Sequence, residues 1–238
     1  MSASLAPWLT PAFILMAAPQ ALAHRDDYLD ETFVYQTVES GELELEAWAE
    51  THHPLAGPNI FVSTLSVECG LTSRWMADVA FQWDHPQGAR TVFGRFRAET
   101  RYRFSEEGRK AVDLAISSEY ELVRLGNGLP DEQELSPRLI LSKDLWPKLN
   151  TTLNLDFPYE FSSREISFSY ALGLRYPAES VFRIGAELRH KPSDRQATIL
   201  PQIWYVPQES LALKLGLSEG LTARSEPWFL RFALEIEI

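Results

Sequence analysis

The C-terminal stretch PWFLRFALEIEI, residues 227–238, alternates apolar and charged side chains. Every second position is apolar, at Trp228, Leu230, Phe232, Leu234, Ile236 and Ile238. Arg231, Glu235 and Glu237 fall between them. Because successive side chains of a β-strand point to opposite faces, one face of this stretch is wholly apolar and the other is charged. An apolar face packs into a core in a soluble sheet, but it faces lipid in a membrane barrel.

The same alternation recurs along the chain from Glu42 onward, and no stretch has the pattern of an amphipathic helix. In residues 89–104, ARTVFGRFRAETRYRF, one parity is mainly apolar and the other is almost continuously charged. The pattern predicts twelve strands, at residues 42–52, 60–71, 75–84, 91–104, 110–124, 134–144, 149–160, 164–176, 181–191, 196–206, 211–219 and 226–238. Most of them reach the roughly ten residues that a tilted strand needs to cross a membrane.

The connections between these strands alternate in kind. Short polar or proline-containing turns occupy every second junction: LTSR, SEEGRK, LWPKL, PAES and PQES. Slightly longer segments lie at the other junctions: HPLAGPN, DHPQGA, GNGLPDEQ, YEFSSR, KPSDRQ and EGLTARSE. An outer-membrane barrel has short periplasmic turns and longer outer loops, and an even strand number leaves both termini periplasmic. Residues 24–41 include a further strand-like stretch, which we interpret as a periplasmic or lumen-inserted lead because a thirteenth strand would break this arrangement.

The N-terminal residues 1–23 are typical of a cleaved signal peptide. An apolar run around residues 13–18 precedes Ala21-Leu22-Ala23, an A-x-A cleavage signal. A spanning helix would need about 20 apolar residues without proline interruptions. We therefore expect export, a mature chain that begins at His24, and a barrel at residues 42–238. Cys69 is the only cysteine and does not lie at the cleavage site, which indicates neither an internal disulfide nor a lipoprotein anchor.

Composition excludes two classes of protein. The mean hydropathy of −0.19 excludes a bundle of membrane helices, but it is compatible with a barrel whose polar lumen dilutes its apolar exterior. The formal net charge of −11, without any run of lysine and arginine, argues against a nucleic-acid partner.

A β-sandwich is the alternative fold, since it also needs many alternating strands. Twelve apolar faces would overfill a sandwich core, and the export signal favours a membrane barrel. Aromatic residues also lie near strand ends, as in interfacial girdles, at Trp48, Trp75, Trp83, Tyr102, Phe104, Phe157, Tyr159, Tyr176, Tyr205 and Trp228. The sequence therefore predicts an all-β protein, a closed antiparallel up-and-down transmembrane β-barrel of about twelve strands in the outer membrane, with lipid as its immediate partner.

Several of these stretches carry a resemblance to a known group of proteins. Residues 68–81 (ECGLTSRWMADVAF), RYRF with its following turn, residues 137–155 (PRLILSKDLWPKLNTTLNL) and the terminal strand resemble bacterial outer-membrane β-barrels of the porin/transporter type, including those of phenol-degradation (MetA) pathways. The resemblance implies the fold, the location and the barrel assembly machinery as a partner. Ile238 replaces the aromatic residue that usually ends the assembly signal.

If the apolar parity faces lipid, the charged parity lines the lumen. The predicted selectivity residues are Arg95, Arg97, Glu99, Arg101, Arg103, Glu42, Glu44, Glu46, Glu235 and Glu237. Closing the barrel places the first strand beside the last, so that an acidic wall would face a basic one. Such walls would select ions by the sign of their charge. The alternative is that the arginines form cross-strand ion pairs with neighbouring carboxylates, which would plug a narrow lumen.

Catalytic and metal chemistry have little support in the sequence. His24 as an N-terminal residue is a copper-ligand candidate with His52 or His53, but HRDD lacks a spaced ligand pattern. Candidates for a lipid-active hydrolase lie near the predicted outer loops, at His85, His190, Ser162, Ser163 and Ser193, and no hydrolase motif accompanies them. We expect a conduit for small solutes without enzyme activity or cofactor. The alternatives are a non-conducting anchor or ligand-binding barrel and, third, a lipid-modifying enzyme.

Overall fold

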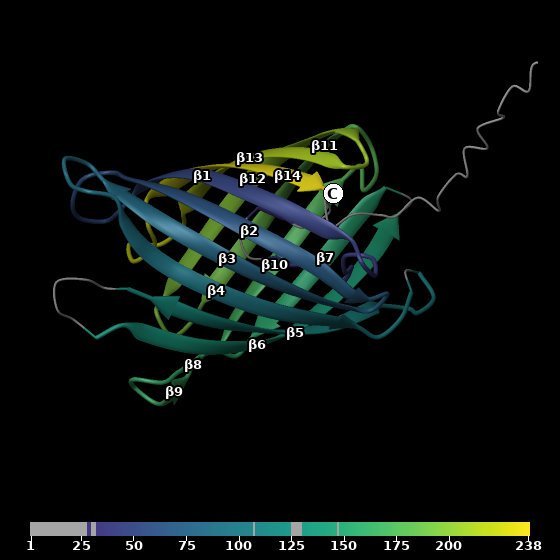
Figure 1. Ribbon diagram of the computed structural model, residues 1–238, viewed down its shortest axis with the longest axis horizontal. Helices are drawn as coiled ribbons and strands as arrows, with labels where there is room; N and C mark the ends of the chain where they lie inside the picture. Colours follow the sequence, from purple (N-terminus) through teal and green to yellow (C-terminus); the bar gives the residue numbers. More distant parts are fainter. Residues whose placement is uncertain (1–27, 30–31, 107, 125–129, 147) are drawn as a thin grey trace, which may run out of the picture.

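The computed structural model describes residues 28–29, 32–106, 108–124, 130–146 and 148–238. Within them the chain forms a barrel of tilted antiparallel strands (Figure 1). The strands are β1 (Leu43–His53), β2 (Ile60–Thr72), β3 (Trp75–Pro86), β4 (Val92–Arg103), β5 (Asp113–Val123), β6 (Glu132–Trp146), β7 (Leu149–Asp156), β8 (Tyr159–Glu160), β9 (Glu165–Ile166), β10 (Ser169–Tyr176), β11 (Phe182–Lys191), β12 (Gln196–Gln208), β13 (Leu211–Gly220) and β14 (Trp228–Glu237). No helix in these ranges is long and apolar enough to cross a membrane.

The barrel is closed by pairing of the first strand with the last. Each long strand pairs with its neighbours in the sequence, and β1 pairs with β14. In this closing pair Glu44 lies opposite Glu237 and Glu46 lies opposite Glu235. Apart from the two-residue strands β8 and β9, twelve strands form the wall in the described part of the chain. The predicted closed, twelve-stranded antiparallel barrel is therefore confirmed.

Two of the predicted strands are interrupted without a change of register, one of them at a proline. β7 pairs with β6 up to Asp156, and β8 resumes the same register at Tyr159 opposite Leu135. Pro158 lies in the gap, and a proline has no backbone N–H with which to continue the ladder. β9 and β10 are separated by Ser167 and Phe168, and the N–H of Ser167 donates to the carbonyl oxygen of Pro158 at 2.9 Å. The β8–β9 pair therefore extends the β7–β10 hairpin beyond the wall (Figure 1).

The two rims differ in their connections. We call the rim at the ends of β1 and β14 near Leu43 and Glu237 the turn side, and the opposite rim the loop side. One turn-side connection is longer than predicted, because β5 begins at Asp113 rather than near residue 110. The Asp113 carboxylate accepts a hydrogen bond from the backbone N–H of Gly108 at 3.2 Å, and Gly108 has a φ of 65°. That left-handed turn needs glycine and delays the start of the strand.

The barrel is apolar outside and polar inside. Large apolar side chains on the outward parity are exposed, including Leu65 at 46% and Phe232 at 42%. Among the described residues, buried polar and charged side chains outnumber buried apolar ones. Outward aromatic pairs lie near both rims, for example Tyr102–Phe104 on the turn side and Trp83–Phe93 on the loop side. This distribution suits a lipid-facing exterior.

Trp48 is an exception to the predicted aromatic girdles, and its assignment there was wrong. Its ring points inward, where the guanidinium groups of Arg97 and Arg231 lie 4.7 and 4.9 Å from its centre. The reason is parity, because Trp48 lies two and four residues after Glu46 and Glu44 and therefore shares their inward face of β1.

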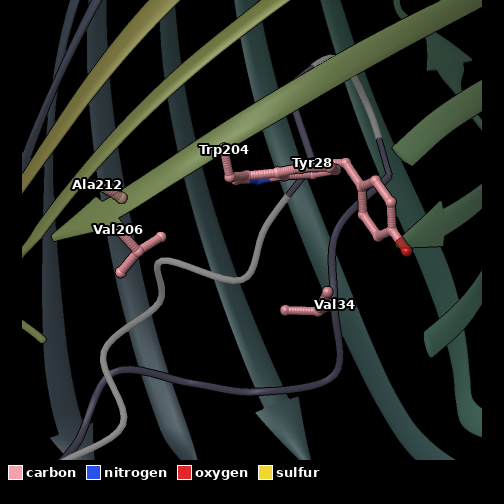
Figure 2. Packing of buried hydrophobic residues seen from close by; sticks show 5 residues of the cluster. All are labelled: Tyr28, Val34, Trp204, Val206 and Ala212. Atoms are coloured by element: carbon pink, nitrogen blue, oxygen red, sulfur yellow. The ribbon is translucent and has the colours of Figure 1, made fainter. Parts of the chain in front are cut away.

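Residues 28–29 and 32–42 are here called the lumen segment; residues 28–29 and 32–38 lie inside the barrel, and Ser40 and Gly41 form an exposed turn before β1. Tyr28, Leu29, Val34 and Val38 are buried, although the segment forms no strand of the wall. Figure 2 shows Tyr28 and Val34 beside Trp204, Val206 and Ala212 of β12 and β13. The segment thereby supplies apolar partners for side chains that would otherwise face an open lumen.

Candidate functional site

The backbone of the lumen segment is held by side chains of the wall. The N–H of Leu29 donates to Oε1 of Gln202 at 2.9 Å, and the N–H of Thr32 donates to Oε2 of Glu187 at 3.0 Å. Gln202 in turn donates to Oε1 of Glu187 at 2.7 Å, which fixes the two acceptors relative to each other. Buried backbone groups outside a strand need such partners, so the wall satisfies the segment in the way a neighbouring strand would.

Arginines of β4 and β14 bind carbonyl oxygens of the segment. Nη1 of Arg101 donates to the carbonyl oxygens of Val34 at 3.1 Å and Gln36 at 3.4 Å. Arg231 donates to the carbonyl oxygen of Leu29. The segment is therefore bonded to strands around the barrel rather than to one sector of it.

Apolar contacts complete the seat of the segment. The Tyr28 ring packs edge-on against Trp204 with 5.6 Å between the ring centres. A Cβ added at Gly173 would lie 2.6 Å from the Tyr28 ring, and one at Gly216 would lie 2.9 Å from Leu29. The two glycines thus form notches that admit these side chains.

The apolar seat was missed in the sequence, although β12 carries a signal for it. In QATILPQIWYVPQ both parities are apolar, since Leu200, Trp204 and Val206 lie on the inward face and Ile203 on the outward face. In a barrel with a polar lumen, a strand that is apolar on both faces indicates that another segment packs against its inward face.

Aromatic side chains and arginines fill the middle of the lumen. The Phe33 ring lies between the guanidinium groups of Arg101 and Arg138, which are 4.5 and 4.2 Å from its centre. A hollow of about 20 Å³ remains beside Phe33, Trp48 and Arg97. Such a volume is close to the minimum for one water molecule, so the lumen segment nearly fills this level of the barrel.

The loop-side half is hollow by contrast. One cavity of about 360 Å³ extends over β1, β11, β12 and β14, and a second of about 220 Å³ extends over β4 to β7. Arg95, Arg189 and Lys191 line both cavities. A third hollow of about 170 Å³ is mainly acidic and is lined by Glu121, Glu132, Glu134 and Glu160 among others, with Lys191 at its edge. We call these hollows together the vestibule.

The predicted arginines lie on the inward face of β4, each near a carboxylate. Arg95 lies 3.2 Å from Glu121, Arg97 lies 4.0 Å from Glu119, and Arg101 lies 3.1 Å from Glu99. Arg103 lies 3.2 Å from Glu39 and 3.4 Å from Glu106. This arrangement has the form of the ion-pair alternative, in which charged neighbours rather than a bare basic wall line this sector.

The predicted glutamates lie at the turn side, where the closing strands meet. Glu44 and Glu235 are buried, and Lys214 forms an ion pair with Glu235. Glu42 precedes β1, and burial together with the nearby Glu39 carboxylate raises its pKa. The acidic end is thus partly neutralised by a lysine from β13, which the sequence pattern did not single out.

The histidine and serine candidates for catalysis have separate hydrogen-bond and packing partners among the described residues. His85 is hydrogen-bonded to Ser63 and to Thr91, both at 2.8 Å, on the outward face. Ser162 and Ser163 donate to Glu160, and Ser193 donates to Asp194. His190 packs against Tyr170 with 5.3 Å between the ring centres. In the hydrogen bonds of the described residues, His85 has no acidic partner that would orient it as a general base.

Metal ligation gains no support from the described part of the chain. No group of three or more histidine, cysteine, aspartate or glutamate side chains in these ranges is arranged to hold a metal ion. His24 lies outside the described residues, as does the predicted signal peptide at residues 1–23.

Comparisons with solved structures identify the fold. The KdgM porin is similar with a TM-score of 0.60 and 11% identity, over 81% of this chain and 98% of that chain. The COG4313 outer membrane channel from Pseudomonas putida F1 is similar with a TM-score of 0.61 and 12% identity, over 86% and 98% of the two chains. The outer membrane phospholipase A from Escherichia coli has a TM-score of 0.51 and 10% identity, over 92% and 97%. The chain therefore has the fold of bacterial outer-membrane porin-type barrels.

Sequence comparison adds no closer relative. No protein-family model matches the chain, and no curated protein is detectably similar in sequence. Identities near 11% show a common fold alone, so the role of the lumen must be argued from this chain's own residues.

Proposed function

We propose that this protein is exported, inserts in the outer membrane and conducts small solutes through its charged lumen. The inside-out burial is the observation that carries the proposal. Ionised side chains such as Glu50 and Arg231 are buried within the barrel, while Leu65 and Phe232 are exposed outside it. Water-soluble solutes need a polar path, and the vestibule offers one from the loop side.

The location can be tested with a depth-dependent pair of substitutions on β2. Leu65 and Phe61 both face outward, Leu65 near the middle of the strand and Phe61 next to the loop side. Arginine costs about 2–4 kcal/mol at the midplane of a bilayer and about 0–1 kcal/mol near its interface. Leu65→Arg is expected to reduce the heat-resistant folded band on a gel much more than Phe61→Arg. Equal effects of both substitutions would contradict a lipid-facing exterior.

Conduction can be tested by single-channel recording in planar bilayers. We expect conductance steps whose ion preference shifts toward cations in Arg95→Glu and Arg97→Glu, because each replaces an inward positive charge with a negative one. Arg74→Glu, in the β2–β3 turn, is the matched control, and we expect it to leave the ion preference unchanged. Steps with the same ion preference in all variants would show that these lumen arginines do not set selectivity.

A second candidate is a closed barrel that binds a ligand or anchors a partner without conducting. The lumen segment favours it, because Phe33 and Trp48 leave only the hollow of about 20 Å³ between them and their neighbours. A folded, inserted full-length chain that shows no steps at any applied voltage would support this function over the conduit.

A further inference from the structure

We propose that the vestibule holds a binding site for a small organic polyanion between Arg95, Arg189 and Lys191. This inference deepens the proposed function by naming the charge class of the solute that enters from the loop side. Three cations from two strands lie close together: Arg95 comes from β4, and Arg189 and Lys191 come from β11. All three line both the cavity of about 360 Å³ and the cavity of about 220 Å³.

The larger cavity has a cationic wall. Arg95, Arg189, Lys191 and Arg231 line it, and among the described residues Glu226 is the only carboxylate on its lining. Glu226 is itself bonded to Nδ1 of His52 at 3.0 Å. The cavity therefore presents more positive than negative charge to a solute inside it.

The carboxylates that pair with Arg95 and Lys191 lie outside the lining of the cavity of about 360 Å³, whereas Glu121 lines the cavity of about 220 Å³. Glu121 lies 3.2 Å from Arg95, Asp194 lies 3.0 Å from Lys191, and neither carboxylate lines the larger cavity. Nε of Arg95 is also buried without a hydrogen-bond partner among the described residues. Guanidinium groups form strong paired hydrogen bonds to carboxylates, and the Arg95 side chain is partly exposed to the cavity, so it suits an anionic ligand.

The volume of the larger cavity and the residues at its inner end suit a small ligand. A volume of about 360 Å³ lies within the range of small-molecule sites. Phe229 and Arg231 form the inner end of the cavity, and Arg231 is also bonded to the carbonyl oxygen of Leu29. The lumen segment thus closes the site from below, so that a solute entering from the loop side would stop against these charges.

Isothermal titration calorimetry of the full mature chain in detergent micelles tests the site, with citrate as the polyanion and putrescine as the matched polycation. We expect citrate to bind, putrescine not to bind, and the citrate Kd to rise about tenfold in Arg95→Gln and in Arg189→Gln, the loss of one charge-assisted contact. Arg189→Lys keeps the charge and is expected to retain most of the affinity. Arg74→Gln removes a cation from the opposite rim and is expected to leave the Kd unchanged.

Three results would overturn the site: no citrate binding to a folded chain, equal binding of putrescine, or a citrate Kd that neither glutamine variant changes. If a glutamine variant fails to fold, as judged by loss of heat-modifiable migration, Arg189→Lys and higher KCl concentration still decide the matter, because screening must weaken a charge-based site. Conductance steps without citrate binding would remove the site and leave the conduit. Citrate binding by a barrel that shows no conductance steps would support the site and contradict the conduit.

Discussion

Arg95 and Arg101 lie on the same inward face of β4, but they occupy different halves of the lumen. Arg101 is 1% exposed, pairs with Glu99 and holds the backbone of the lumen segment. Arg95 is 35% exposed, pairs with Glu121 and lines the vestibule. On the turn side, an arginine therefore binds the segment that fills the lumen. On the loop side, an arginine forms part of the charged surface of a cavity. The lumen segment makes the difference, because its described residues fill the turn-side half and contact Arg231 at the inner end of the larger cavity.

The largest expected effect comes from removing the segment that separates the halves. Deletion of residues 24–41 from the mature chain is expected to make the conductance steps larger and more frequent, because it opens the turn-side half. Planar-bilayer recording measures the change. Heat-modifiable migration is the control for folding, and unchanged conductance in a folded deletion would show that the segment does not limit passage.

The two arginines provide the next prediction. Arg101→Gln removes the cation that pairs with the buried Glu99. The free energy of unfolding is therefore expected to fall by about 3 kcal/mol. Arg95→Gln is expected to cost about 1 kcal/mol or less, since its ion pair is partly exposed to water. Urea unfolding in lipid vesicles measures both values. Similar losses for the two variants would mean that the halves do not differ in how tightly charges are held.

A smaller effect is expected at the notch for Tyr28. In Gly173→Val the new Cβ would come within 2.6 Å of the Tyr28 ring, and overpacking of this kind costs about 2 kcal/mol. The same urea titration applies. Tyr28→Ala in the Gly173→Val background removes the clash and is expected to restore part of the loss; if the double variant is no more stable than Gly173→Val, the notch does not seat Tyr28.

The smallest effect is expected at the edge of the vestibule. Lys191 lies 3.0 Å from Asp194, and this hydrogen bond lowers the pKa of the Asp194 carboxyl, which stays ionised near neutral pH. Asp194→Asn removes that competitor, so the citrate affinity is expected to rise about twofold at pH 7, as for an exposed ion pair. A weaker citrate affinity in Asp194→Asn would contradict the role given to Lys191.

Several features of the molecule could be predicted from the sequence because they depend on period two alone. The alternation in residues 227–238 gave the outward Leu230 and the inward Arg231, and the even strand count gave the pairing of β1 with β14. The same rule places Trp48 inward, because Trp48 has the same parity as Glu44 and Glu46 on β1. Proline chemistry accounts for the break at residue 158.

The tertiary structure decided which inward residues meet one another. Tyr28 and Trp204 are far apart in the sequence, and their contact depends on where the barrel holds β12 relative to the lumen segment. Likewise Arg95 and Arg189 share a cavity only because β4 and β11 lie across the lumen from each other. Strand alternation fixes the face of each side chain locally, whereas the contents of an enclosed lumen depend on the closure of all the strands at once.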